Sequence, residues 1–218
     1  IVCLRGLRLP HMIVMESDLS GPTVGMNVEA AARAMTAGLL AQGHRRLALI
    51  SGHREHADRR KRQGIQSALA KSGLRLSDLP DHETDYRPEA GLAAACAILD
   101  ARPRPTAVIC FDDNLALQMI SAAQHRGIRV PQQLSVTGFN DATFSALVTP
   151  AISTVRLPVA DAGAAASAAI LDAAATGALP RDIMLSHEIL WRRSTGPALV
   201  ENCAVQSKRR VRPKRRKP

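Results

Sequence analysis

Polar and aromatic residues follow the short apolar segments of this sequence, at positions where their side chains could hold a small ligand. These residues are Glu16, Lys61, Tyr86, Asp112 and Asn140, with Arg59 and Arg60 beside Lys61. If the apolar segments are parallel strands, the residues that follow them meet at one edge of a sheet. Ligands of open parallel sheets bind outside this edge. Several such residues at a single edge indicate a binding cleft better than they indicate unrelated loops.

The stretch Thr106–Val155 shows how the chain positions this edge. Thr106–Cys110 is apolar and β-branched, long enough for a buried strand and too short for a helix. An apolar stripe at helical spacing follows from residue 116 to residue 123 and ends before Gly127. Leu134–Gly138 is the second strand. Two strands joined by one helix lie parallel in one sheet, with a right-handed crossover.

The same alternation runs through the rest of the chain and predicts an α/β fold with doubly wound parallel sheets. The other predicted strands are Met12–Met15, Leu47–Ile50, a short one around Thr84, Ile152–Val155, Asp182–Ser186 and Glu188–Arg192. The other predicted helices begin at four places. Two of them follow an N-cap, Asn27 or Asp58, and the polar loop Ser51–Ala57 precedes Asp58. The other two begin at Pro88 and Pro158, and the last helix ends at Gly177.

The net charge of +10 is concentrated at the C-terminal end. Eight Lys and Arg residues lie between Lys208 and Lys217, so residues 1–207 carry a net charge of only +2. We expect residues 198–218 to be a disordered basic tail. This tail either binds phosphate backbones without sequence preference or only increases solubility.

The composition predicts a cytoplasmic protein with no membrane segment. No apolar run reaches the roughly 18 residues of a membrane span, and the first residues lack a signal-peptide pattern. The four cysteines show no CxxC spacing. Cys96 and Cys110 lie in a predicted helix and strand, which indicates small buried side chains in a reducing compartment.

Metal and catalytic chemistry have little support in the sequence. His53 and His56, with His44 nearby, lack a matching Cys or acidic pair for a metal. Asp112 and Asp113 could hold Mg²⁺ for phosphoryl transfer, but no Gly-rich phosphate loop accompanies them. The motifs G-x-S-x-G, G-x-G-x-x-G, G-x-x-x-x-G-K and H-E-x-x-H do not occur. We therefore expect no enzyme activity, no cofactor and no metal site.

Several long motifs carry a family resemblance. CFDDNLAL, RGIRVPQQLSVTGFND and LVTPAISTVRLP follow one another in the second half of the chain. NVEAAARAMTAGLLAQGHRRLALISG and the aromatic-x-Pro-Glu-x-Gly pattern at Tyr86–Gly91 lie upstream. Together they resemble the lactose/galactose repressor (LacI/GalR) family of bacterial transcription regulators. The resemblance extends from about Leu9 to Pro197.

This resemblance implies the two-lobed fold of type I periplasmic binding proteins. Residues 1–25 and 151–178 would form an N-lobe that lacks its opening strands and helices, and residues 26–150 and 180–197 the C-lobe. The resemblance also implies an effector-sensing and dimerisation domain, in which a small polar metabolite, a sugar or sugar derivative, binds between the lobes. The chain would form a homodimer. DNA would be bound only through a helix-turn-helix, which we do not find in these residues.

The resemblance implies roles for three of the candidate residues. Glu16 corresponds to an acidic residue that ends an N-lobe strand, and Tyr86 corresponds to an aromatic that stacks on the ligand. Asp112 stands where the family has Asn or Asp.

Two candidates depart from the family pattern. Lys61 stands where the family prefers Arg, and Asn140 stands where the first Asp of Gly-Phe-Asp-Asp is usual. Lys cannot make the planar bidentate contact of Arg. Arg59, Arg60 or Arg62 could supply the guanidinium instead.

Each candidate also has a purely structural interpretation. Asp112 and Asn140 could cap the helices that follow them, and Tyr86 could be ordinary packing. The run Asp58–Arg62 could be a solvated helix face. For the whole chain, the alternatives are a sugar-binding protein of a transport system, an enzyme on a doubly wound sheet, and an inactive fragment of a regulator.

Overall fold

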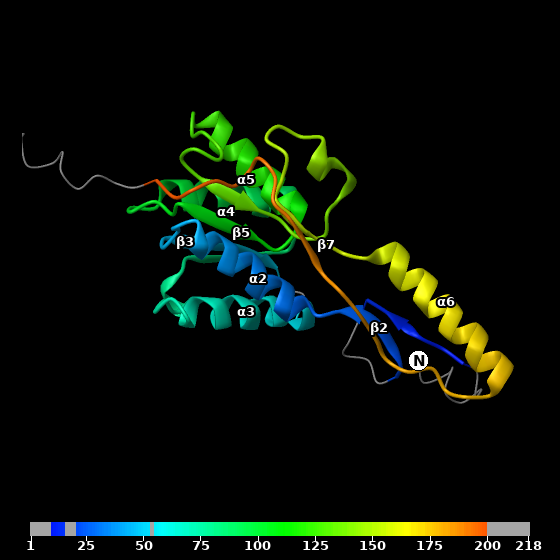
Figure 1. Ribbon diagram of the computed structural model, residues 1–218. Coiled ribbons are helices and arrows are strands. Elements are labelled where there is room, and N and C mark those ends of the chain that lie inside the picture. The colour runs from blue at the N-terminus through cyan, green and yellow to red at the C-terminus, as the bar shows by residue number, and fades with distance from the viewer. Residues whose placement is uncertain (1–9, 16–20, 53–54, 200–218) are drawn as a thin grey trace, which may run out of the picture.

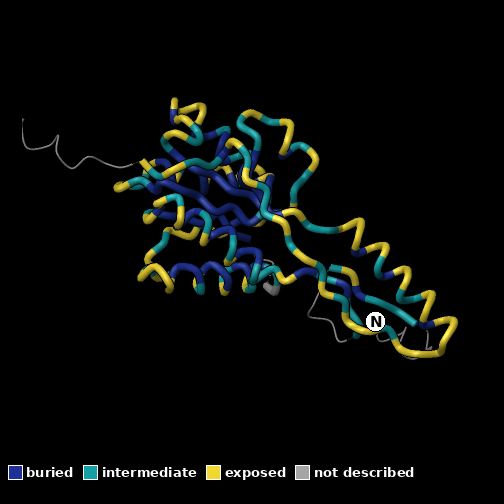
Figure 2. Tube along the Cα trace, viewed as in Figure 1, coloured by how far each residue is buried: buried dark blue, intermediate teal, exposed yellow. Residues whose placement is uncertain are grey.

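The computed structural model describes residues 10–15, 21–52 and 55–199, which form a large unit and an elongated small unit (Figure 1). The large unit contains a four-stranded parallel sheet, and the small unit contains a three-stranded sheet with one long helix. Buried residues are concentrated in the large unit (Figure 2). Two residues of the sequence analysis, the ligand candidate Glu16 and His53 of the histidine group weighed as a metal site, lie outside the described residues.

The sheet of the large unit has the doubly wound arrangement that the sequence predicts. Its parallel strands are β4 (Asp81–Thr84), β3 (Leu47–Gly52), β5 (Ala107–Cys110) and β6 (Ser135–Thr137), in that spatial order. Helices α2 (Val28–Ala41) and α3 (Glu55–Ala70) cover one face, and α4 (Pro88–Asp100) and α5 (Asp113–His125) cover the other. Both faces are therefore buried, as parallel sheets require.

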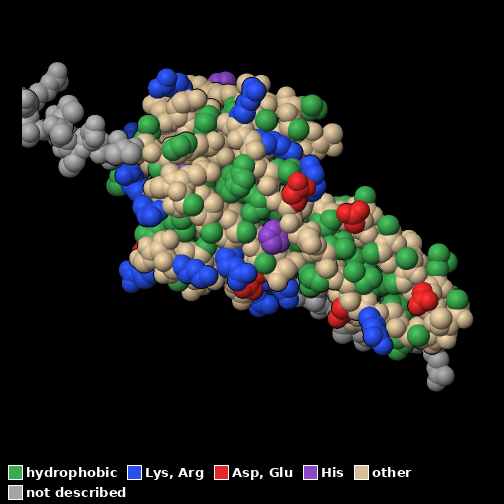
Figure 3. Space-filling view, viewed as in Figure 1, with side chains coloured by type: hydrophobic (Ala, Val, Ile, Leu, Met, Phe, Trp, Pro, Cys, Tyr) green, Lys and Arg blue, Asp and Glu red, His purple; other side chains and the backbone are tan. Residues whose placement is uncertain are grey.

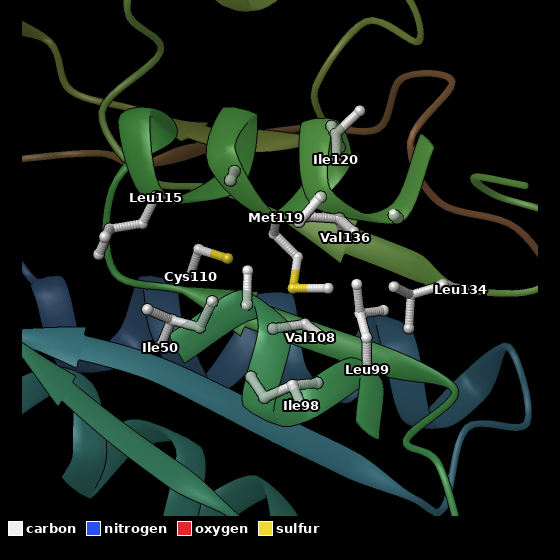
Figure 4. Close-up of a cluster of buried hydrophobic side chains, with 14 of the residues drawn as sticks. Ile50, Ile98, Leu99, Val108, Cys110, Leu115, Met119, Ile120, Leu134 and Val136 are labelled. Carbon is white, nitrogen blue, oxygen red and sulfur yellow. The ribbon is translucent and has the colours of Figure 1, made fainter. Parts of the chain in front are cut away.

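Alternate residues of each strand enter different cores, because side chains along a strand point to opposite faces. Leu49 and Ile109 pack against α2 and α3. Ile50, Val108 and Val136 pack against α4 and α5, where Figure 4 shows them around Met119. The apolar runs found in the sequence thus supply two cores at once.

The ends of several helices follow the predicted local chemistry. Asn27 caps α2, since its side-chain oxygen accepts a hydrogen bond of 2.9 Å from the Ala30 N–H. Pro88 is the first residue of α4. Gly177 ends α6 in the left-handed conformation, with φ of 73°.

The predicted start of α3 is wrong. The helix begins at Glu55, so Asp58 lies within its first turn and is not its N-cap. β3 also continues to Gly52, which leaves little of the predicted polar loop at Ser51–Ala57. Aspartate is a residue type that often caps helices, so the sequence indicated an N-cap at Asp58. In the structure, the Asp58 side chain belongs instead to a buried cluster described below.

The small unit consists of β1 (Ile13–Val14), β2 (Thr23–Met26), β8 (Ile183–Leu185) and α6 (Val159–Thr176). β8 pairs parallel with β2, so it lies in the small sheet and not with residues 26–150, where we expected the whole of 180–197. The next strand, β9 (Glu188–Leu190), pairs antiparallel with β7 (Thr154–Arg156). The chain therefore passes from the small unit toward the large one just after β8.

α6 is long and apolar enough to cross a membrane by length and composition alone, and it is the one helix of the described residues for which this holds. Its inner side packs on the small sheet, where Ala162 and Ala166 contact Val24. The core helix of a globular protein passes the same test of length and composition. The helix alone is thus weak support for a membrane segment.

The last described residues run along the large unit as an added segment beside β6. The Val136 N–H donates to the Ser194 carbonyl at 2.8 Å, and the Ala198 N–H donates to the Gln42 carbonyl at 2.9 Å. His44 holds the same segment from inside, with Nε2 at 3.0 Å from the Gly196 carbonyl oxygen. Because a carbonyl only accepts, Nε2 carries a proton there.

Burial lowers the pKa of His44 below its ordinary value of 6.5, although the hydrogen bond to Gly196 opposes this change. Folding therefore favours the neutral imidazole, and protonation favours unfolding. We expect the free energy of unfolding to fall as the pH decreases below about 6.5. The fall should be smaller in His44→Gln, because that variant lacks the titrating ring. Urea denaturation at pH 7.5, 6.5 and 5.5 measures the difference, and parallel curves for the two proteins would contradict it.

Candidate functional site

Four of the candidate residues lie at or beside the carboxyl ends of the strands of the large sheet. Tyr86 follows β4, Asp112 follows β5 and Asn140 follows β6, while Lys61 is on α3, directly after β3 in the chain. This is the edge from which β7 and the chain before α2 lead to the small unit (Figure 1). These four residues therefore lie at or beside one edge of the large sheet.

Asp58 is the centre of the cluster at this edge. Its side chain is buried, with a residue exposure of 1%. The Tyr86 hydroxyl lies 2.8 Å from Asp58 Oδ2 and 3.0 Å from Oδ1, so it donates to this carboxylate. Lys61 Nζ lies 3.4 Å from Asp58 Oδ1. A single carboxylate on α3 thus connects two of the residues that the sequence marked as candidates.

Lys61 is held under the ends of β5 and β6. Its Nζ donates to the Phe111 carbonyl at 2.8 Å. The same atom lies 5.2 Å from the ring centroid of Phe111 and 4.7 Å from that of Phe139, within the range of cation–π attraction. Lys61 is only 8% exposed. The Lys61 ammonium therefore contacts the protein itself at the ends of β5 and β6. An arginine that makes a bidentate contact directed outward would have a different role.

Tyr86 is fixed in position by the backbone of β3. A Cβ atom on Gly52 would lie 1.9 Å from Cε2 of Tyr86, so the ring lies directly on the last residue of the strand. Tyr86 itself has φ of 66°, which is unfavourable for a residue with a side chain. The contact with Gly52, the positive φ of Tyr86 and the hydrogen bond to Asp58 together fix the position of the ring at this edge.

Asp112 is the N-cap of α5, as one of the two interpretations of the sequence held. Its Oδ1 accepts a hydrogen bond of 2.9 Å from the Leu115 N–H. A carboxylate has two oxygen atoms and about four acceptor positions. Because the residue is only half-buried, capping does not by itself use up its capacity to accept hydrogen bonds at the edge.

Asn140 is not a helix cap. The following 3₁₀ helix η2 (Thr143–Ala146) begins three residues later, and its N-cap position is Ala142. Asn140 is exposed, and its N–H donates to the Val155 carbonyl at 2.9 Å. Its φ is 105°, and that of Asp141 is 54°. Backbone strain of this kind persists where the surrounding structure holds the loop, and it gathers at binding sites.

Asp141 joins the end of β6 to the strands that lead to the small unit. Its carboxylate accepts from Arg192 Nη2 at 2.6 Å and from Arg156 Nε at 2.8 Å. Arg156 on β7 also donates to Glu188, its cross-strand neighbour on β9, at 2.7 Å. Burial alone would raise the pKa of Asp141, but the hydrogen bonds from the two arginines outweigh it and lower the pKa.

The alternative arginines lie on the same helix as Lys61, and Arg62 Cζ is 5.5 Å from the ring centroid of Phe111. Arg62 donates to Ser51 at 2.6 Å and to Asp81 at 3.1 Å, which ties it to β3 and β4. Arg59 is exposed and Arg60 is half-buried. Neither is among the described contacts of Asp58, Lys61 and Tyr86.

Asp58 and Asp141 were missed as site residues in the sequence, together with Phe111, Phe139 and Arg192. A signal existed for part of this set. Each Phe directly precedes a candidate polar residue, and Asp141 is the second acidic position of the Gly-Phe-Asn-Asp motif. For Asp58 and Arg192, nothing in their sequence context distinguishes them from surface charges.

The large unit is a parallel sheet covered on both faces, with polar side chains at its carboxyl edge and strands leading to a second unit. This is the architecture of a doubly wound α/β protein. Residues 36–195 match the periplasmic binding protein-like domain. The chain belongs to this family, in the form found in LacI/GalR-type transcription regulators.

Two similar proteins are transcription regulators. The chain is 33% identical to catabolite control protein A of Priestia megaterium over 186 residues, which cover 83% of this chain and 55% of that protein. It is 36% identical to the HTH-type transcriptional repressor PurR of Erwinia tasmaniensis over 135 residues, covering 62% and 40% of the two chains. The chain thus spans about half the length of these relatives.

Solved structures confirm the fold. The transcription regulator GntR from Chromobacterium violaceum matches with a TM-score of 0.80 and 30% identity, over 89% of this chain and 73% of that one. A LacI family regulator from Enterococcus faecium with bound ribose matches with a TM-score of 0.82 over 90% and 74% of the chains. Its 19% identity supports likeness of fold alone.

Removing the Asp58 carboxylate should destabilise the large unit, because it removes both the buried ion pair with Lys61 and the hydrogen bond from Tyr86. We expect Asp58→Ala to lower the free energy of unfolding by about 3 kcal/mol. Asp78→Ala is the matched control, since Asp78 pairs with Arg75 at the same spacing of three residues but at an exposed site. It should change stability little. Equal effects of the two substitutions in urea denaturation would contradict the central role of Asp58.

The backbone at Asn140 gives a second prediction. A side chain with a Cβ is disfavoured at positive φ, and glycine is not. Asn140→Gly should therefore be more stable than Asn140→Ala by about 1 kcal/mol. Chemical denaturation of the two variants tests this. An alanine variant as stable as the glycine variant would show that the loop is not strained there.

Proposed function

We propose that this chain is the effector-sensing and dimerisation domain of a LacI/GalR-type transcription regulator. In this proposal a small polar metabolite, a sugar or a sugar derivative, binds between the large and small units. The observation that carries the proposal is the convergence of Tyr86, Asp112 and Asn140 on one sheet edge, with Lys61 behind them. Relatives that are named repressors support the regulatory role.

The chemistry of the edge favours a ligand rich in hydroxyl groups. The Tyr86 ring offers an apolar surface for the faces of a sugar ring, and its orientation is fixed by Gly52. Asp112 and Asn140 offer acceptors and an amide donor around that surface. Lys61 Nζ lies 3.4 Å from the buried Asp58 carboxylate and donates to the Phe111 carbonyl. Among the solved neighbours, one contains ribose and another is a cellobiose complex.

The network around Asp141 is the proposed route from ligand to response. A ligand that contacts Asn140 acts directly beside Asp141. The Asp141 carboxylate accepts hydrogen bonds from Arg156 and Arg192, which lie on or next to the strands between the units. The ligand shifts the arrangement of the two units only by the difference between its affinities for the open and closed forms. Such couplings are typically about 1–3 kcal/mol.

The remaining parts of the proposal concern partners. The chain acts as a homodimer in the cytoplasm, and DNA is read by a helix-turn-helix that is not part of these 218 residues. Arg59 and Arg60 remain proposed secondary contacts from α3, and Glu16, which lies outside the described residues, remains a proposed ligand contact.

Trp191 gives a direct assay, because it is the single tryptophan of the sequence and precedes Arg192. Its ring lies against α2, where a Cβ atom on Gly38 would be 2.2 Å from Trp191 Cζ2. We expect a saturable change in tryptophan fluorescence with one member of a panel containing ribose, cellobiose, galactose and their phosphorylated forms. Asn140→Ala and Tyr86→Ala should weaken that affinity at least roughly tenfold.

The control variant for this titration is Arg75→Ala, which removes an exposed side chain in the segment between α3 and the amino end of β4. It should leave the affinity unchanged. If the edge variants bind the responding sugar as well as the wild type does, the proposed site is wrong. If no member of the panel gives a saturable change, the proposed ligand class is wrong.

A further inference from the structure

The outer side of α2 and α3 carries a groove that is separate from the edge described above. The groove has a volume of about 450 Å³. Its lining residues come from the middle and end of α2 and from the end of α3, whereas the candidate site uses the beginning of α3. They are Arg33, Ala34, Ala37, Leu40, Ala41, Arg45, Ala68, Lys71 and Ser72.

Close packing of the two helices at one end forms this groove. A Cβ atom on Gly64 of α3 would lie 2.1 Å from the Glu29 carbonyl oxygen, so the two helix backbones touch there. Beyond this contact, four alanines line the space between the helices, and alanine is too small to fill it. Both helices bury their opposite sides in the core with the large sheet. The groove is therefore a preformed feature of a rigid helix pair.

The rim of the groove carries three cations and no acidic residue. Arg33, Arg45 and Lys71 are exposed and line it. Arg45 donates to the carbonyls of Leu40 and His44, which keeps it at the C-terminal end of α2. No salt bridge to Arg33 or Lys71 is present within the described ranges 10–15, 21–52 and 55–199. Cations at helix C-termini offset the helix dipole, but Arg33 is in the middle of α2 and has no such explanation.

We propose that this groove binds an acidic helical segment of a partner protein. Eight residues of α2 separate Arg33 from Ala41, a length of about 12 Å, which matches about two turns of a docked helix. Small apolar side chains of that helix contact the alanine floor, and its carboxylates meet the three cations on the rim. Figure 3 shows Lys and Arg side chains gathered on the side of the large unit where α2 and α3 lie.

The composition of the groove and of the chain excludes two other occupants. The C-terminal residues 208–217 are strongly basic, so the chain's own end is repelled by the same cations. A nucleic acid makes most of its contacts through phosphates and stacked bases. The lining contains no aromatic residue, and its apolar floor has no role in phosphate binding.

The test uses the full chain and a fluorescein-labelled 16-residue helical peptide with a stripe of alanine flanked by glutamates. We expect fluorescence anisotropy to show saturable binding at low salt that weakens as the salt concentration rises. A peptide with Gln at every Glu position should not bind. Arg33→Glu combined with Lys71→Glu should weaken binding roughly tenfold or more. Ala37→Leu, which fills the exposed floor without changing charge, should also weaken it.

Two matched controls separate the groove from the basic C-terminal residues. Arg129→Glu combined with Arg181→Glu makes the same change of charge at exposed positions outside the groove. Ala93→Leu adds the same side chain on the exposed face of α4. Both controls should bind the acidic peptide as the wild type does. The proposal is overturned if the peptide does not bind, or if both charge reversals weaken its binding equally. It is also overturned if a duplex DNA displaces the peptide and binds the groove variants, but not the control variants, more weakly than the wild type.

Discussion

The buried carboxylate of Asp58 is the interaction on which the arrangement of the sheet edge depends. It lies on α3, yet it accepts a hydrogen bond from Tyr86 beyond β4, and it faces Lys61, whose ammonium donates to the Phe111 carbonyl at the end of β5. Burying a carboxylate and an ammonium is unfavourable unless both are well paired. Because Asp58 and Lys61 both lie on α3, a displacement of α3 relative to the strands would keep this pair but break the hydrogen bonds from Tyr86 to Asp58 and from Lys61 to the Phe111 carbonyl. Asp58 therefore selects a single geometry for the edge, and the flat presentation of the Tyr86 ring follows from it.

A second ionic group connects this edge to the rest of the molecule. Asp141 shares its carboxylate between Arg156 and Arg192, which lie on or next to the two antiparallel strands β7 and β9. Asn140, at the proposed ligand position, is adjacent to it and has a strained backbone. In the proposed function, a ligand at Asn140 acts on these two cations through the neighbouring Asp141.

The sequence predicts the sheet and most helix ends well because these depend on local patterns. Apolar runs give β3, β5 and β6, and Asn27, Pro88 and Gly177 bound their helices as their types suggest. Prediction fails where a residue has a long-range partner. Asp58 has the type of an N-cap, but its partners at Lys61 and Tyr86 keep it inside the helix. The pairing of β8 with β2 joins segments about 160 residues apart, and no local pattern encodes it. The resemblance to LacI/GalR regulators indicated the edge, and the structure shows which side chains support it.

The most direct test of the account is a crystal structure of the chain with the sugar that gives the strongest Trp191 response. The account predicts a sugar ring stacked on Tyr86, with hydroxyl groups within hydrogen-bonding distance, about 3 Å, of Asp112 and Asn140. Asp58 and Lys61 should remain paired behind it. A sugar bound away from the carboxyl edge of the large sheet, or a bound sugar that displaces Tyr86 from Asp58, would contradict the account.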